Sequence, residues 1–208
     1  MKEIKAVIFD MGSVLTNDGW PKVYKKIADH SGLSKEKVEE ICMPILREWS
    51  VGGFNEGVFW KKFEEKSSKK ISAIFADNFW YLTYKKWTKD IAESWEIVKE
   101  LRAKGVRLAL LSNTIDPHLI VNQEIKRVER LKKIGFDTFV WSNKVGFRKP
   151  DPKIFEIILD KLKLTASECV FVDDVRSNVE AAEKLGFKSI QFKSPALLRE
   201  KLKDLGLL

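Results

Sequence analysis

The 208 residues of this chain suffice for one large domain, or for one domain that carries an insert. Hydrophobic residues make up 44% of the sequence, yet no apolar run reaches the roughly 20 residues that span a bilayer. The net charge of +8 comes mostly from lysines interleaved with glutamates rather than gathered in a compact arm or stripe. We therefore expect neither a membrane partner nor a nucleic-acid partner.

The first residues lead directly into an apolar strand pattern, without the apolar region and cleavage site of a signal peptide. We expect a cytoplasmic protein, and its lysine- and glutamate-rich surface is typical of thermophilic proteins. The two cysteines, Cys42 and Cys169, are far apart and in no metal-ligand spacing, which predicts free, buried thiols.

A first strand is predicted at residues 4–9, and the following block, 16–88, shows no convincing strand pattern. Its helices are predicted at 21–30, 34–48, 56–67 and 72–86, with Gly52-Gly53 as a break and Ser34 as a helix N-cap. The block is rich in aromatic residues. Most of them are predicted to form the core of a small helical bundle, and a few to line a pocket.

From residue 89 onward, strands and helices alternate. Strands are predicted at 106–111, 138–141, 170–172 and 188–192, and helices at 90–104, 117–134, 152–162, 177–185 and 195–205. This alternation predicts an α/β fold with a parallel sheet covered by helices on both faces. Residues 1–15 and 89–208 would form this core, and 16–88 a helical insert after the first strand.

Polar residues follow three of the apolar strand patterns: Asp10, Ser112-Asn113-Thr114 and Asp173-Asp174. Ligands of open α/β sheets bind at the carboxyl ends of the strands, so these residues are expected to meet in one site. Lys149, held between Gly146 and two prolines, is the fourth candidate.

These residues could have either a catalytic role or a purely structural one. Asp10 could attack phosphorus and form an aspartyl phosphate, or it could simply form a turn. The backbone after it, at Gly12 and Ser13, would turn N–H groups toward an anion. Ser112 could donate to a phosphoryl oxygen, or cap the helix near Pro117.

The acidic pair and the lysine suggest a charged centre. Two adjacent carboxylates after a buried strand are costly unless they are paired or bind a metal, and Mg²⁺ prefers such ligands. Asp174 is favoured as the direct ligand beside Asp10, and Asp173 as a second ligand or as the partner of Lys149. Asn178 is predicted to hydrogen-bond around these ligands, and Arg148 to point away.

Four segments of the chain resemble the motifs of the haloacid dehalogenase (HAD) superfamily in order and spacing. They are Phe9 to Leu15, Leu111 to Thr114, Gly146 to Phe155, and Val170 to Asp174 with the helix that follows. The resemblance implies a Rossmann-like core with a helical cap at 16–88.

The resemblance also implies roles for the site residues. Asp10 would be the nucleophile, Ser112 and Asn113 would contact the phosphoryl group, and Lys149 would stabilise charge. The metal site for Mg²⁺ would combine Asp10, the Gly12 carbonyl and the pair Asp173 and Asp174, while Gly12, Ser13 and Thr114 would contact substrate.

The chain departs from the family pattern at Gly12, where phosphatases of the family usually carry a general acid/base aspartate. That group contributes about 10²–10⁴-fold to rate, and Asp18 is a hypothetical substitute. The sequence favours a Mg²⁺-dependent phosphatase of a small phosphorylated metabolite, sugar phosphates included. The alternatives are a 2-haloacid dehalogenase and a catalytically weak phosphate-binding protein. Exposed aromatics of the cap would favour a homodimer.

Overall fold

The computed structural model describes residues 3–17 and 19–208 and contains a five-stranded parallel sheet. Its strands lie in the order β3-β2-β1-β4-β5, with bounds β1 Ala6–Phe9, β2 Arg107–Ser112, β3 Phe136–Trp141, β4 Cys169–Asp173 and β5 Lys188–Gln191. After β3 the chain crosses to the other side of β1, so a topological switch point lies beside that strand. This confirms the predicted α/β fold.

Alternating residues of the strands face opposite layers of the core. In β1, Val7 and Phe9 join one buried cluster, while Ala6 and Ile8 join the other. β2 and β4 divide in the same way, as the period of two of a strand requires. Both faces are therefore apolar and both need covering, which explains why these strands read as continuous apolar runs.

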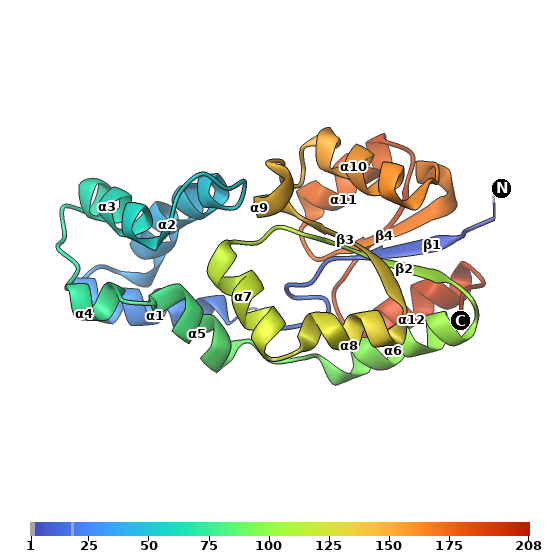
Figure 1. Cartoon of the computed structure of the whole chain (residues 1–208), viewed down its shortest axis with the longest axis horizontal. Coiled ribbons are helices and arrows are strands. Elements are labelled where there is room, and N and C mark those ends of the chain that lie inside the picture. The colour runs from blue at the N-terminus through green and yellow to red at the C-terminus, as the bar shows by residue number, and fades with distance from the viewer. Residues whose placement is uncertain (1–2, 18) are drawn as a thin grey trace.

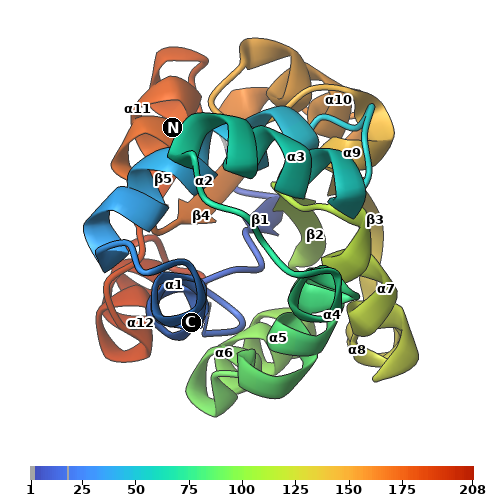
Figure 2. The same cartoon turned by 90° about the vertical axis from the view of Figure 1, so that its left-hand side faces the viewer.

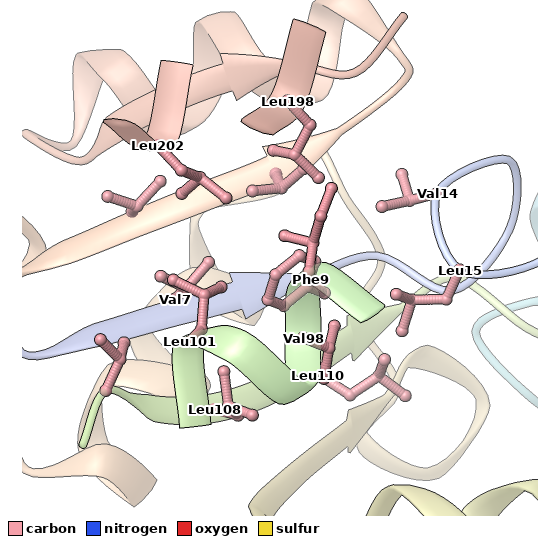
Figure 3. Packing of buried hydrophobic residues seen from close by; sticks show 14 of the residues in the cluster. Val7, Phe9, Val14, Leu15, Val98, Leu101, Leu108, Leu110, Leu198 and Leu202 are labelled. Atoms are coloured by element: carbon pink, nitrogen blue, oxygen red, sulfur yellow. The ribbon is translucent and has the colours of Figure 1, made fainter. Parts of the chain in front are cut away.

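Helices cover the two faces of the sheet. One layer consists of α6 (Ala92–Ala103), α8 (Arg127–Ile134) and α12 (Pro195–Asp204), and the opposite layer of α10 (Pro152–Leu162) and α11 (Arg176–Lys184) (Figure 1). Figure 3 shows Val98 and Leu101 of α6, and Leu198 and Leu202 of α12, directed at Val7 and Phe9.

The insert forms a separate group of helices beyond the carboxyl ends of the strands (Figures 1 and 2). Its elements are α1 Trp20–Ser31, α2 Lys35–Trp49, α3 Glu56–Ser67, α4 Ala73–Ala76 and α5 Phe79–Trp87. As predicted, the Ser34 hydroxyl caps α2, and Gly52 and Gly53 separate α2 from α3 with φ values of 87° and 101°. The division at residues 16–88 stays a prediction.

The aromatic residues of the insert form most of its core. Trp49, Phe59 and Trp80 are almost fully buried and meet one another at ring-centroid distances of 4.8–6.4 Å. Every described aromatic side chain of the insert is buried or half-buried. The exposed aromatics on which the homodimer prediction depends are therefore not found there, and the homodimer stays untested.

Two predicted helices are each two helices, so these predictions were wrong. Residues 117–134 divide into α7 (Asp116–Glu124) and α8, and residues 72–86 into α4 and α5. The breaks lie at Lys126 and Asn78, whose φ values are 57° and 50°. Neither break carries the glycine or proline that marks a helix end in a sequence. Two short elements, α9 (Ser142–Val145) and the 3₁₀ helix Ala166–Glu168, were not predicted.

Helix α7 belongs to the core in sequence but also packs against the insert. The His118 ring of α7 stacks on Tyr84 of α5 at 4.1 Å, and Ile115 joins the apolar cluster of the insert. Asn122 donates from Nδ2 to the Tyr84 hydroxyl at 3.0 Å. The insert therefore meets the core along α5 and α7 as well as through its two connecting segments.

Two sequence predictions concern residues outside the site. Both cysteines are buried and free, as predicted. Among residues 3–17 and 19–208, no helix combines the length and the apolar character that crossing a membrane requires.

Candidate active site

Lys149 is the centre of a buried charged cluster at the carboxyl ends of β1, β2 and β4. Its Nζ lies 2.9 Å from Asp10 Oδ1, 2.7 Å from Asp173 Oδ2 and 2.7 Å from the Leu111 carbonyl oxygen. The side chain of Lys149 is 0% exposed. The three donors of the ammonium are thus matched by three acceptors, which is the condition for burying a charge without large cost.

Asp10 follows β1 and is held from two sides. Its Oδ1 accepts from the Met11 backbone N–H at 2.7 Å as well as from Lys149. Burial raises the pKa of Asp10 to about 7, against the opposing effect of the Lys149 ammonium. For Lys149, burial alone would lower the pKa, but the charges of Asp10 and Asp173 outweigh burial and raise it. The Lys149 ammonium therefore offsets only part of the cost of ionising the buried Asp10 carboxyl group.

Asp173 and Asp174 are adjacent but lie in different environments. Asp173 is fully buried and accepts from Lys149, from Asn178 Nδ2 at 3.0 and 3.1 Å, and from the Val175 backbone N–H at 2.9 Å. This arrangement favours the predicted role of Asp173 as partner of Lys149 over that of a direct metal ligand. Asn178 contacts it as predicted.

Asp174 is half-buried and lines the cavity described below. Burial raises its pKa first, the Asp173 carboxylate adds to this, and a hydrogen bond with Ser13 opposes it. A carboxyl group with this environment is stabilised in its charged form by a cation.

The three carboxylates fit a hard metal ion. One oxygen from each of Asp10, Asp173 and Asp174 lies within 4.8 Å of the others. Asp10 and Asp174 face the cavity together with Gly12, whereas the oxygens of Asp173 already accept three donor groups. Oxygen donors of this kind fit Mg²⁺, with Asp10 and Asp174 facing the cavity, while the Gly12 carbonyl as a further ligand stays a prediction.

The last residue of β2, Ser112, and the two residues after it differ in their contacts. Asn113 lines the cavity, but its side-chain amide is committed to the Lys149 loop: Nδ2 donates to the Lys149 carbonyl oxygen at 3.0 Å, and Oδ1 accepts from its N–H at 2.9 Å. This positioning role was not predicted. Thr114 lines the cavity, and its backbone N–H donates to the Ser142 hydroxyl.

Ser112 is 4% exposed and, among the described residues, is not one of those that line the cavity. The alternative that Ser112 caps the next helix is wrong, because Ile115 occupies the N-cap position of α7 and no side chain caps it. Contact between Ser112 and a phosphoryl group stays a prediction.

A cavity of about 490 Å³ lies between the charged cluster and the insert. Most of its apolar wall comes from the insert, with Trp20 and Tyr24 on α1 and Met43 and Leu46 on α2. Ile115 of the core completes this wall. Lys35, Arg47 and Arg148 also line it. The prediction that Arg148 points away was wrong, because the loop held by Asn113 turns its side chain toward the insert, where Nε donates to Ser50 Oγ at 3.0 Å.

His118 is a cavity residue that the sequence did not indicate. Burial lowers its pKa to about 3, so the imidazole is neutral near pH 7 and stacks on Tyr84 as an aromatic group. A lone histidine on a helix carries no pattern that would have found it.

Open space surrounds Gly12, the residue at which the chain departs from the motif. A Cβ added there would meet no atom within 4 Å, and Gly12 does not have the positive φ that side chains avoid. A side chain at this position is therefore sterically allowed, and its absence leaves room in the cavity. Asp18, the hypothetical substitute acid, lies outside the described residues.

Comparisons with known proteins support the motif assignment. The family model for haloacid dehalogenase-like hydrolases matches residues 4–186. A phosphorylated carbohydrates phosphatase of Thermotoga maritima is 28% identical over 200 residues, which cover 90% of this chain and 84% of that protein. Mouse acyl-CoA dehydrogenase family member 10 is 30% identical over 98% of this chain, but the match spans only 19% of the mouse protein.

Solved structures show the same fold. A HAD family enzyme of Bacteroides thetaiotaomicron superposes with a TM-score of 0.72, at 23% identity and with 92% of this chain and 95% of that chain covered. A dehalogenase superposes with a TM-score of 0.70, at 19% identity and with coverage of 97% and 98%. Because the family model matches most of the residues, including all four motifs, this chain belongs to the haloacid dehalogenase-like hydrolases.

Proposed function

We propose that the protein is a Mg²⁺-dependent phosphatase that hydrolyses small phosphomonoesters through an aspartyl phosphate on Asp10. The observation that carries the proposal is the buried contact of Lys149 with both Asp10 and Asp173, beside an Asp174 that faces the cavity. A phosphatase-named relative that aligns over most of its own length supports the same class of reaction.

Each residue has a definable task. The Asp10 carboxylate forms a bond to phosphorus while the bond from phosphorus to the alcohol oxygen breaks, and water then attacks phosphorus, which releases phosphate and regenerates Asp10. Lys149 holds Asp10 in place and offsets the charge of the entering phosphate. A bound Mg²⁺ ion would neutralise phosphoryl charge next to Asp10 and Asp174.

The cavity determines which alcohols fit. Its volume of about 490 Å³ suits a small organic group, and its aromatic and aliphatic wall would exclude water from the phosphoryl group. We propose a small phosphorylated metabolite as the substrate, with sugar phosphates in this class. The cytoplasmic location stays a prediction.

The alternative of a 2-haloacid dehalogenase shares the Asp10 nucleophile but uses no metal. Lys149 compensates the charge of Asp173, but Asp174 faces the cavity. Its carboxylate would repel the anionic substrate of a dehalogenase unless a cation is bound beside it. The alternative of a phosphate-binding protein without turnover is supported only by the missing aspartate at Gly12.

Hydrolysis of a chromogenic aryl phosphate with Mg²⁺ or with a chelator separates these functions. We expect release of the aryl alcohol with Mg²⁺ and a loss of at least about 100-fold when a chelator removes the ion. Release of halide from a 2-haloacid in the presence of chelator would instead identify a dehalogenase. Binding of phosphate without any product would identify the binding protein.

Installing an acid at position 12 is expected to accelerate the reaction. The Gly12→Asp side chain fits the open space and would supply a proton to the leaving alcohol, for which general acid catalysis contributes about 10²-fold or more. The gain should be large for an alkyl phosphate and small for an aryl phosphate, whose leaving group needs no proton. Gly12→Asn is the matched control, since it fills the same space without an ionisable group. Equal rates for the two variants would show that the protein already uses another acid.

A further inference from the structure

Two arginines of the cavity wall have no carboxylate partner in the part of the chain that the structure describes. In the described parts of the chain, 3–17 and 19–208, none of the ion pairs involves Arg47 or Arg148, whereas other arginines, such as Arg127 and Arg199, are paired with Asp90 and Glu100. Both Arg47 and Arg148 line the cavity that opens onto Asp10. Arg148 is half-buried and Arg47 is exposed, and both line the cavity, unlike most cations of this basic chain.

The two arginines come from different parts of the molecule, and Ser50 connects the side chain of Arg148 to the backbone of Arg47. Arg148, in the loop that carries Lys149, donates from Nε to Ser50 Oγ at 3.0 Å, and Ser50 Oγ donates to the Arg47 backbone carbonyl at 2.8 Å. Within residues 3–17 and 19–208, Nε is the only nitrogen of the Arg148 side chain with a hydrogen-bond partner, which leaves its terminal nitrogens available to a ligand. The Lys149 loop is in turn held by Asn113, so Arg148 is positioned at a set place relative to Lys149.

The electrostatics of the pair favour an anion between them. Burial lowers the pKa of the half-buried Arg148, and the nearby charge of Arg47 lowers it further. Lys35 also lines the cavity, and Glu39 is the one carboxylate that the described residues of the insert contribute to this wall. Two like charges held near each other without a partner are unfavourable, and a bound anion relieves that cost.

Arg47 also lies in the last turn of α2, where a cation is stabilised by the helix dipole. That effect explains a basic residue at position 47, but it does not explain a second, half-buried arginine that is brought to the same place from the core.

We propose that Arg47 and Arg148 form a second anion subsite, so that the preferred substrates are phosphomonoesters whose alcohol portion carries another acidic group. The inference rests on the phosphatase function proposed above and goes beyond it, because it names the substrate class. A guanidinium fork binds a carboxylate or a second phosphate with two parallel hydrogen bonds. Sugar monophosphates whose alcohol portion is uncharged are then poorer substrates than phosphomonoesters whose alcohol portion is acidic.

The test compares substrates that differ only in the second charge. 3-Phosphoglycerate and glycerol 1-phosphate share a three-carbon chain, and glucose 1,6-bisphosphate and glucose 6-phosphate form the corresponding phosphate pair. We expect kcat/KM to be about 10- to 100-fold higher for an acidic member than for its neutral partner, mainly through KM. The pair with the larger ratio distinguishes a carboxylate from a second phosphate.

The variants Arg47→Gln and Arg148→Gln are expected to reduce that ratio toward one. Lys61→Gln, which removes an exposed charge from α3 of the same insert, is the matched control and should leave the ratio unchanged. A wild-type ratio near one, or a ratio that survives both arginine variants, would overturn the subsite.

A separate measurement distinguishes failure of the subsite from failure of the phosphatase. If no phosphomonoester is hydrolysed, including the aryl phosphate, the proposed function is wrong. Equilibrium titration of the intact protein with the same two pairs then decides the subsite by affinity. Weaker binding of the acidic members to Arg47→Gln and Arg148→Gln would support it, and equal binding of acidic and neutral members would overturn it.

Discussion

Replacing Asp10 by asparagine is expected to lower kcat for an aryl phosphate by about 10⁴-fold or more, because the amide cannot form the acyl phosphate. The substitution preserves the shape of the side chain, and the amide oxygen can still accept from the Met11 N–H that now binds Oδ1. The variant should therefore fold, which far-ultraviolet circular dichroism and thermal unfolding would check.

The matched control is Asp29→Asn on α1, an exposed carboxylate that pairs with Lys25 at the surface. It makes the same change of charge away from the cavity and should retain full turnover. Mass spectrometry of wild-type protein quenched during turnover should detect a phosphorylated peptide that contains Asp10, and the Asp10→Asn protein should lack it. Full activity in Asp10→Asn would refute covalent catalysis by this residue.

Replacing Lys149 by methionine is expected to cause the largest combined loss of stability and activity. Asp10 and Asp173 would remain in a buried cluster without their cation, and breaking a buried pair from one side costs about 3–5 kcal/mol. For a chain of this length, that loss lowers Tm by roughly 10 °C. Turnover should fall by about 10³-fold or more, since the charge of the phosphate is no longer offset.

A double variant separates the two effects of Lys149→Met. Combining it with Asp173→Asn removes the fully buried carboxylate that was left unpaired, so part of the lost stability should return while activity stays absent. Lys61→Met, at an exposed position of α3, should change stability by less than about 0.5 kcal/mol. A Lys149→Met protein as stable as wild type would show that the cluster does not depend on the ammonium.

Much of the core was predictable because it follows short-range rules. Val106 to Leu111 predicts a strand because a parallel strand is apolar on both faces, and the structure places a strand at Arg107–Ser112. The helix at 152–162 was predicted with its proline start, and the structure has the same bounds. By contrast, the breaks at Asn78 and Lys126 depend on a single left-handed residue each, which no periodicity announces.

The sequence predicted which residues belong to the candidate site better than it predicted the contacts between them. Asp10, Lys149 and Asp173 meet because the carboxyl ends of parallel strands share one edge of a sheet. The sequence left open whether Asp173 is a second metal ligand or the partner of Lys149, and only the contacts of its buried carboxylate favour the second role. Nor could it show that the Asn113 amide holds the Lys149 loop.

The amino-acid sequence by itself determined the class of this protein: a parallel α/β core, a helical insert after the first strand, and four polar motifs that together mark the family. These are properties of local pattern and of motif order. The tertiary structure alone decided what surrounds the candidate active site. Arg47 and Arg148 are separated by about half of the chain, and Ser50 connects the side chain of one to the backbone of the other. His118 and Tyr84 meet only because α7 packs on α5. Contacts between distant segments depend on how the insert packs against the core, and no local pattern records that packing.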